Sequence, residues 1–369
     1  MIYLDHNATT HINTQVKEIM ISLMNMPLNP SSIHTYGRKA KNIIEDSRHQ
    51  IRLLVAANKE SSKYRVIFTS SGTESNNLVL FNFSAAADIF ISAVEHPSVL
   101  FATAKYHNVK IIKIDHKGII DLDHLANLLT DSSSNKKLVS VMLVNNETGI
   151  IQPIKKIVAI AHKFNALVHC DLVQAVGKLD IDIVDLDIDI ATISGHKFGG
   201  PPGVGALIIK NSIMLEAQIL GGGQEQRIRS GTENVLAIAG MGLAAQIAHN
   251  QLKDRIDKMY KLQQKLENNL IEIATIIGQS VNRLPNTSLI VPNSKLESAI
   301  QLIALDLRGF AVSSGSACSS GKINKSHVLG AMGLADTCAK SAIRVSTSPD
   351  NTEQEIDLFI KAFREINNP

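Results

Sequence analysis

Short apolar segments alternate with longer amphipathic stretches over the first 210 residues of the chain. The short segments are continuous apolar runs, which are typical of strands buried on both faces of a parallel sheet. The longer stretches repeat their apolar positions with helical spacing, and this alternation predicts an α/β domain with a mostly parallel sheet. The predicted strands are 66–70, 89–94, 110–114, 138–144, 167–170, 188–193 and 204–210, and the predicted helices are 36–57, 74–83, 99–107, 122–130 and 154–164.

The last predicted strand of this region departs from the parallel pattern. The five residues 199–203 that precede it are Gly and Pro, which make a turn too short for a helical crossover. We therefore expect strand 204–210 to run antiparallel to its predecessor. In the stretch 235–248, Gly240 and Gly242 formally match part of a dinucleotide-binding fingerprint. They follow no convincing strand, so we expect them to serve close helix packing.

The pattern changes near residue 250, where a long charged helix is predicted over 251–270. Strands then alternate with helices more loosely, and the chain ends in a helix with a capping box formed by Thr352 and Glu355. We interpret residues 250–369 as a smaller second domain. Its segment 313–321 is rich in serine and glycine, which predicts an accessible and mobile loop.

Composition narrows the class of protein. Lys plus Arg is 37 and Asp plus Glu is 34, and without a basic cluster this argues against charge-driven nucleic-acid binding. The three cysteines include no C-x-x-C pair, so neither a disulfide framework nor a structural zinc site is expected. Neither a signal-peptide pattern nor a run long enough for a membrane span is visible. We therefore expect a cytoplasmic protein that binds neither nucleic acid nor membrane.

Polar residues with chemical capability follow the predicted strands. Ser71-Gly72-Thr73 follows the first strand, His96 the second, Asp171 the strand 167–170 and Lys197 the strand 188–193. Ligands of open α/β sheets bind at the carboxyl ends of the strands, so these residues should converge. Pyridoxal phosphate needs an amine that forms a Schiff base, a carboxylate that binds the pyridine nitrogen and a helix start that binds the phosphate.

Each of these residues also has an ordinary structural interpretation. A lone lysine is usually solvated, Asp171 is equally suited to be a helix cap, and His96 alone is more often structural than catalytic. The turn at 71–73 alone is more often a plain turn. The combination is what favours a cofactor site over these separate interpretations.

An ordered set of motifs then resembles the cysteine desulfurases of the NifS/IscS type, within the aminotransferase class V family, over nearly the whole chain. The motifs are Tyr3-Leu-Asp-His-Asn-Ala-Thr-Thr10, Asn29-Pro-Ser-Ser-x-His34, Thr69-Ser-Ser-Gly-Thr-Glu-Ser75, Glu95-His96, Val144-Asn-Asn-Glu-Thr-Gly149, His169-Cys-Asp-x-x-Gln174, Ser194-Gly-His-Lys197, Gly222-Gly-Gln-Glu225, Arg229-Ser-Gly-Thr232 and Ser313-Ser-Gly-Ser-Ala-Cys318.

This resemblance implies pyridoxal-phosphate fold type I, similar to aspartate aminotransferase. Its large domain would span 15–250 with a mostly parallel seven-stranded sheet, and residues 1–14 and 251–369 would form a smaller α+β domain that carries the Cys318 loop. The resemblance also implies a set of site residues. At the cofactor ring, Lys197 would be the Schiff-base lysine, Asp171 would meet the ring nitrogen, Gln174 and Asn146 would lie near the ring hydroxyl, and His96 would stack on the ring as a proton carrier. Gly72, Thr73, Ser194 and His196 would hold the phosphate, Thr232 would reach the phosphate of a neighbouring subunit in a homodimer, and Arg344 would bind the substrate carboxylate with Asn7 in the same pocket.

The implied reaction converts L-cysteine to L-alanine and leaves the sulfur as a persulfide on Cys318, which passes it to an acceptor such as an iron–sulfur scaffold. No resident metal is expected, although Cys318 would contact an iron–sulfur cluster transiently. Cys170 on its apolar strand is expected to point away from the cofactor face, and Cys338 has no assigned role. The alternatives are another class V enzyme, either a selenocysteine lyase or a small-substrate aminotransferase, and a non-enzymatic sulfur-relay protein on a degenerate scaffold.

Overall fold

The computed structural model of the chain describes residues 1–56, 59–314 and 326–367. A seven-stranded sheet lies at its centre in the order β2-β8-β7-β6-β5-β3-β4. Its strands are β2 (Tyr64–Thr69), β3 (Asp88–Ser92), β4 (Val109–Ile112), β5 (Lys137–Ser140), β6 (Ala166–Asp171), β7 (Ile190–Ser194) and β8 (Gly205–Lys210). Strand β8 pairs antiparallel with both β7 and β2, while the other neighbouring pairs are parallel. The predicted mostly parallel sheet with one antiparallel strand is therefore confirmed.

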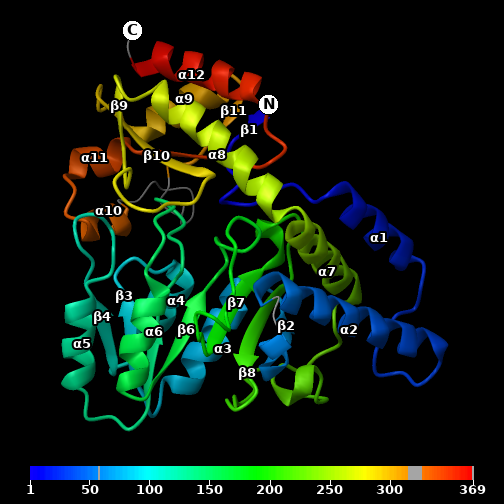
Figure 1. Cartoon of the computed structure of the whole chain (residues 1–369). Helices are drawn as coiled ribbons and strands as arrows, with labels where there is room; N and C mark the ends of the chain where they lie inside the picture. The colour runs from blue at the N-terminus through cyan, green and yellow to red at the C-terminus, as the bar shows by residue number, and fades with distance from the viewer. Residues whose placement is uncertain (57–58, 315–325, 368–369) are drawn as a thin grey trace.

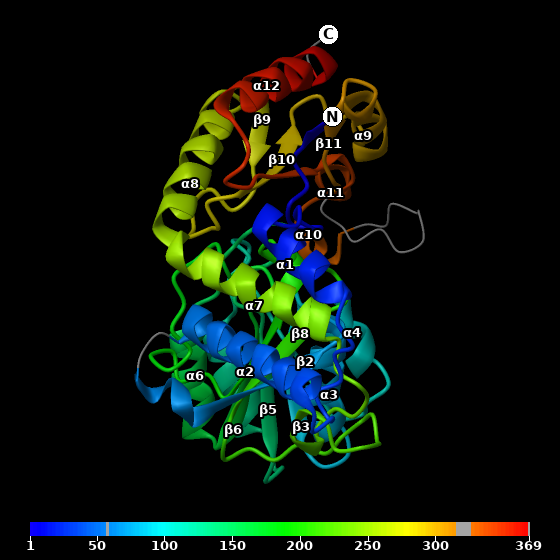
Figure 2. The same cartoon turned by 90° about the vertical axis from the view of Figure 1, so that its right-hand side faces the viewer.

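Helices cover both faces of this sheet (Figures 1 and 2). Alternate strand residues serve the two faces, as the period of a strand requires. In β2, Val66 belongs to the larger core cluster, with residues of α2, α5, α6 and α7, whereas Ile67 belongs to the cluster with α3 and α4. The helices of this half are α1 (Thr14–Met24), α2 (Thr35–Val55), α3 (Gly72–Phe83), α4 (Pro97–Thr103), α5 (Leu122–Thr130), α6 (Ile154–Lys163) and α7 (Val235–Asn250).

Two glycines of α7 explain how closely its neighbours approach. A Cβ on Gly242 would lie 2.7 Å or less from atoms of Ser47 on α2, and one on Gly240 would lie 2.9 Å from the Sδ atom of Met20 on α1. The distances at Gly242 are too short for real contacts, so packing requires this glycine, whereas a Cβ at Gly240 would force Met20 to shift. The expectation of close helix packing is confirmed for this segment.

A second, smaller unit follows residue 250 and packs above the carboxyl edge of the large sheet (Figure 1). Its three-stranded antiparallel sheet has the order β12-β10-β9, and a pair of two-residue strands, β1 and β11, runs parallel. Leu4 from the start of the chain belongs to its core. The elements are β1 (Ile2–Tyr3), α8 (Leu252–Asn268), β9 (Ala274–Ile276), β10 (Thr287–Pro292), α9 (Ser298–Asp306), β11 (Phe310–Ala311), α10 (His327–Ala331), α11 (Asp336–Ser341), β12 (Ile343–Ser346) and α12 (Glu353–Asn367). The exact division of the chain into 1–14, 15–250 and 251–369 stays a prediction.

The predicted element boundaries were wrong in a few places. The predicted strand 138–144 ends as regular strand at Ser140, although Val141 and Leu143 still donate backbone hydrogen bonds to the carbonyls of His169 and Asp171. Helix α1 was missed, because only Val16 and Leu23 along it are buried and Ile19, Ile21 and Met24 are exposed. The capping box of α12 is present, with Thr352 and Glu355 exchanging hydrogen bonds of 2.8 and 3.2 Å.

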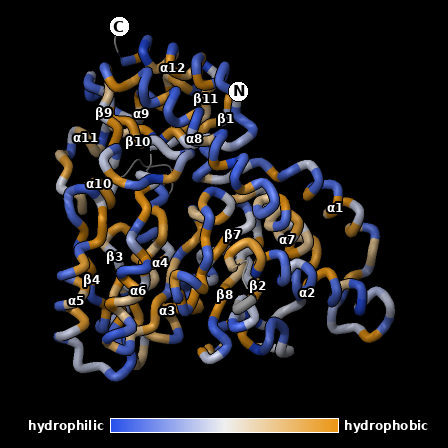
Figure 3. Tube along the Cα trace, viewed as in Figure 1, coloured by the Kyte–Doolittle hydropathy of each residue, from blue (hydrophilic) through white to orange (hydrophobic). Residues whose placement is uncertain are grey.

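Hydropathy follows these layers, with apolar stretches concentrated along the strands and the inner helix faces (Figure 3). No helix of the described residues is long and apolar enough to cross a bilayer.

The small unit has its own core, which predicts a local stability effect. Phe359 on α12 is fully buried, and its ring lies 5.6 Å from that of Phe310 in an edge-to-face arrangement. Phe359→Ala should lower the free energy of unfolding by about 3–5 kcal/mol, because it removes a large buried side chain and leaves a cavity. Urea denaturation followed by circular dichroism measures this loss. The neighbouring Leu358, which is 48% exposed, offers the matched control Leu358→Ala; equal losses in the two variants would contradict the described core.

Candidate active site

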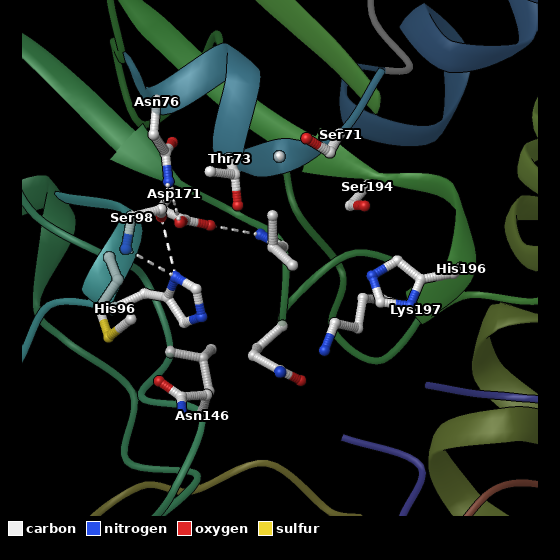
Figure 4. A pocket seen from close by; sticks show the side chains of 15 residues that line it. Ser71, Thr73, Asn76, His96, Ser98, Asn146, Asp171, Ser194, His196 and Lys197 are labelled. Atoms are coloured by element: carbon white, nitrogen blue, oxygen red, sulfur yellow. Dashed lines mark hydrogen bonds between the residues drawn. The ribbon is translucent and has the colours of Figure 1, made fainter. Parts of the chain in front are cut away.

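A cavity of about 190 Å³ opens at the carboxyl edge of the large sheet. Its walls come from the residues that follow β2, β3, β5, β6 and β7. The side chains face one another across the cavity, with Asp171 and His96 on one side and Ser194, His196 and Lys197 on the other (Figure 4). The lining residues are Ser71, Gly72, Thr73, Asn76, His96, Ser98, Met142, Val144, Asn146, Asp171, Val173, Gln174, Ser194, His196 and Lys197.

Asp171 ends β6 on the floor of the cavity and is held by both carboxylate oxygens. Its Oδ1 accepts a hydrogen bond from the backbone N–H of Val173 at 2.9 Å, and its Oδ2 accepts one from Asn76 Nδ2 at 2.8 Å. The capping interpretation and the functional one are therefore compatible, because one oxygen fixes the turn after the strand while the carboxylate lines the cavity. The preceding Cys170 lies on the opposite face of the strand, in the core beneath α2 and α7.

His96 begins α4, and its ring is fixed in orientation. Its Nδ1 accepts a hydrogen bond from the backbone N–H of Ser98 at 3.1 Å and lies 2.8 Å from Ser98 Oγ. Because a backbone N–H is always the donor, the neutral ring carries its proton on Nε2. Burial is the main cause that lowers the pKa of His96, and the nearby Lys197 amine lowers it further while Asp171 opposes the shift. The neutral imidazole is therefore the form that faces the cavity at neutral pH.

The opposite end of the cavity is suited to an anion. Gly72 and Thr73 form the first turn of α3, where backbone N–H groups point outward and the helix dipole favours negative charge. A Cβ on Gly72 would lie 3.0 Å from Val173 and 3.5 Å from Ser194, so glycine allows close approach at this point. Ser71 caps the helix by accepting from the N–H of Glu74 at 3.1 Å. Ser194 and His196 line the same end of the cavity.

Lys197 reaches the cavity from the short 3-10 turn that follows β7. Its amine donates to the backbone carbonyls of Asn7 at 2.5 Å and Ala8 at 2.8 Å. These acceptors are neutral, and the amine is largely buried. Burial, and secondarily the Arg344 guanidinium, lower the pKa of Lys197 to about 8.

Arg344 and Asn7 adjoin the cavity without forming its wall. Arg344 on β12 donates to Asp5 at 2.6 Å and to the backbone carbonyl of Asn146 at 2.8 Å. Its Nε is buried and has no hydrogen-bond partner within the described part of the chain. The backbone carbonyl of Asn7 accepts from both Lys197 and Gln174. The structure thus brings both residues to the edge of the site.

Two sequence-predicted residues remain to be accounted for. Cys318 falls outside the described residues. Thr232 is exposed and does not line the cavity of its own chain. Two residues that precede Thr232 in the chain form ion pairs with helices α2 and α3. Glu225 pairs through its buried carboxylate with the Arg48 guanidinium at 2.8 Å, and Arg229 pairs with Glu74 at 2.9 Å.

Sequence reasoning missed Asn76, which holds Asp171, and Ser98, which joins Asn76 to His96. Asn76 stands four residues after Gly72 in α3, and that spacing places the two on one helix face. The helical spacing was therefore a usable signal. Ser98 gave none, because its role depends on contact with α3.

The residues that surround the cavity fit pyridoxal phosphate. An amine of lowered pKa, a fixed carboxylate and a helix N-terminus surround one volume. Asn76 Oδ1 is buried in the same wall and finds no partner among the residues that the structure describes, which leaves it as an acceptor for a bound group. The donor and acceptor types match the aldehyde, the pyridinium nitrogen and the phosphate of this cofactor.

Comparison with known proteins agrees with this geometry. The family model of aminotransferase class-V matches residues 2–359. A cysteine desulfurase of Sinorhizobium fredii is 39% identical, with 98% of this chain and 95% of that protein covered. The cysteine desulfurase NifS of Azotobacter vinelandii is 36% identical, with 98% and 91% covered. The X-ray structure of a NifS-like protein from Rickettsia africae superposes with a TM-score of 0.94 at 47% identity and covers the full length of both chains.

The sheet order, the cavity at its carboxyl edge and these full-length similarities lead to one assignment. The chain belongs to the aminotransferase class-V family and, within it, to the cysteine desulfurases, which are pyridoxal-phosphate-dependent enzymes.

Proposed function

We propose that this chain desulfurates L-cysteine with Lys197 as the cofactor lysine and Cys318 as the sulfur carrier. The observation that carries the proposal is the Lys197 amine, which lies buried on neutral carbonyl acceptors in the same cavity as the carboxylate of Asp171. Bound pyridoxal phosphate supplies an electron sink for the negative charge that develops on the substrate carbon. Asp171 keeps the ring nitrogen protonated, and Asn76 keeps Asp171 in place.

The remaining residues bind, orient and move protons. Gly72, Thr73, Ser194 and His196 hold the phosphate, while Gln174 and Asn146 donate near the ring hydroxyl. His96 would lie beside the bound ring, and its Nε2 is the atom available to carry protons, because Nδ1 is committed to Ser98. Arg344 binds the substrate carboxylate, and its unpartnered Nε is a free donor for that group. Asn7 adjoins the same pocket and accepts hydrogen bonds from Lys197 and Gln174.

Sulfur transfer then depends on Cys318. Its thiolate attacks the sulfur of L-cysteine, a sulfur–sulfur bond forms and the carbon–sulfur bond breaks. The electron pair of the broken bond stays on the carbon skeleton, which takes up protons and leaves as L-alanine. The persulfide passes to a protein acceptor, for which an iron–sulfur scaffold is our proposal. We place this chemistry in a cytoplasm, where thiols stay reduced, and the thiols of Cys170 and Cys338 are free in the described structure.

A homodimer would complete the site. Thr232 is exposed and lies outside the cavity of its own chain, which fits a residue that serves the phosphate of a partner subunit. Large apolar side chains are exposed on α4 and in the segment that follows β8, among them Phe101 at 69%, Met214 at 80% and Leu220 at 85%. Apolar exposure of this kind marks interaction surfaces, and a second copy of the chain would cover it.

The lowered pKa of Lys197 predicts how cofactor uptake depends on pH. Only the deprotonated amine attacks the aldehyde of pyridoxal phosphate. The rate of reconstitution of cofactor-free protein, followed by absorbance, should therefore rise with pH around a midpoint of about 8. A free lysine would give a midpoint near its ordinary value of about 10.4, and that result would contradict the buried environment.

The sulfur-carrier role predicts a selective loss. Cys318→Ala should keep the yellow colour of bound cofactor, while persulfide transfer and alanine formation fall by about 100-fold or more, because the nucleophile is gone. Alanine is assayed from L-cysteine without added keto acid, which also separates desulfuration from transamination. Cys338→Ala is the matched control, since its thiol is partly exposed and unpaired. Full sulfur transfer by Cys318→Ala would exclude the proposed role.

The dimer proposal predicts complementation between two inactive variants. Lys197→Ala and Thr232→Ala should each be impaired as homodimers. A mixed dimer would contain one complete site, because the Thr232 of the Lys197→Ala subunit serves the other subunit, so activity should return to about half of the wild-type value. Differently tagged, co-expressed subunits permit this measurement. If the mixed dimer stayed inactive, Thr232 would act within its own chain.

A further inference from the structure

Lys178 is a buried amine that has no counter-ion among the described residues, and the proposed mechanism does not use it. It is 5% exposed, and its Nζ donates to Gln174 Oε1 at 3.0 Å and to Asn7 Oδ1 at 3.1 Å. Among the described residues, no carboxylate pairs with it. Burial is the main cause that holds its pKa well below the ordinary value, and the cationic groups of Lys197, Arg344 and Arg255 add to this effect.

Such a lysine is unfavourable as a purely structural element. Lysine is almost never fully buried unless it is paired with a carboxylate, because its charged form loses hydration. A methionine of similar length would fill the same volume without that penalty. The position therefore calls for an explanation in the function of its two partners, both of which belong to the active site.

The two contacts decide which way two side-chain amides point. A lysine amine is a donor only, so the oxygens of Gln174 and Asn7 must face Lys178. The nitrogen of Gln174 consequently points away from Lys178 and donates to the backbone carbonyl of Asn7 at 2.9 Å. The nitrogen of Asn7 donates to Thr287 Oγ1 at 2.8 Å. Without Lys178, the orientation of the Gln174 amide would rest on its contact with the Asn7 carbonyl alone, because Gln174 Oε1 would lose its donor.

The same contacts reach the catalytic amine. The Asn7 carbonyl that accepts from Gln174 also accepts from Lys197, and Asn7 Oδ1 additionally accepts from Asn286 at 3.2 Å. Lys178 thus fixes Asn7, and the backbone carbonyl of Asn7 accepts a hydrogen bond from the Lys197 amine.

We propose that Lys178 is a positioning residue that orients the amide of Gln174, so that a donor and not an acceptor faces the bound cofactor. Gln174 lines the cavity, and its N–H group suits the ring oxygen of pyridoxal phosphate, whereas its carbonyl oxygen would repel it. This inference rests on the role proposed for Gln174 at the ring hydroxyl. It assigns a function to a residue that touches neither the cofactor nor the substrate.

The test is a double-mutant cycle on cofactor affinity in the full-length protein. Pyridoxal phosphate is titrated into cofactor-free wild type, Lys178→Met, Gln174→Leu and the double variant, and the dissociation constants are compared. Lys178→Met and Gln174→Leu should each weaken binding by about tenfold, the effect of one lost hydrogen bond at the cofactor. The double variant should lose little more than either single one, because both changes remove the same donor.

Thermal unfolding of the cofactor-free proteins provides the second readout. Lys178→Met should change the unfolding temperature little, because removing a buried amine that has no carboxylate partner offsets the loss of the donor to Gln174 Oε1. Arg255→Met is the matched control, because Arg255 is a cation near Lys178 that donates to the carbonyl of Gly177 and contacts neither amide. It should leave the affinity for pyridoxal phosphate within about twofold, as expected for a side chain that does not act through Gln174.

Two results would overturn the inference. Unchanged cofactor affinity in Lys178→Met would show that the amide does not need the lysine. An unfolded or less stable cofactor-free Lys178→Met, or losses that simply add to those of Gln174→Leu, would make the role structural. Failure of the wild type to bind pyridoxal phosphate would instead refute the proposed function itself, so the two failures are distinguishable.

Discussion

The buried side chain and backbone of Asn7 form the junction on which the rest of the site depends. Asn7 lies between the large sheet and the small unit, and it bonds to both. Toward the large sheet it receives Lys197, Gln174 and Lys178, and toward the small unit it contacts Thr287, Asn286 and Ser346. A fully buried amide must satisfy its polar atoms, so the position of the N-terminal segment is tied to both halves of the molecule. The Lys197 amine donates to the backbone carbonyl of this same residue.

The parallel sheet supplies the other constraint. Because its strands end at one edge, residues separated by 125 positions along the chain, such as Gly72 and Lys197, meet around one cavity. The chemistry is distributed by strand: the anion-binding turn follows β2, the imidazole β3, the carboxylate β6 and the amine β7. Helices on both faces bury the strands and so hold their carboxyl ends in fixed relative positions.

The sequence allowed prediction of those parts that depend on local pattern or on strand order. Buried strands can be recognised in the sequence as apolar runs. The short Gly/Pro turn before β8 correctly indicated that this strand is antiparallel to β7. The residues that follow each strand, including His96 and Asp171, could be placed at the cavity for the same reason. Helix α1 escaped because it buries only two side chains, and the pairing of β1 with β11 escaped because two-residue strands carry no period.

The supporting residues could not be predicted because their roles arise from contacts between distant segments. Lys178 looked like any lysine after a turn, and only burial against Asn7 and Gln174 distinguishes it. Two buried amines of lowered pKa therefore contact Asn7, and of these two only Lys197 lines the cavity. The most direct test is to reduce the holoenzyme with borohydride, digest it and locate the phosphopyridoxyl group by mass spectrometry. We expect the phosphopyridoxyl group on Lys197. A phosphopyridoxyl group on Lys178 or on any other lysine would contradict the assignment of Lys197 as the cofactor lysine.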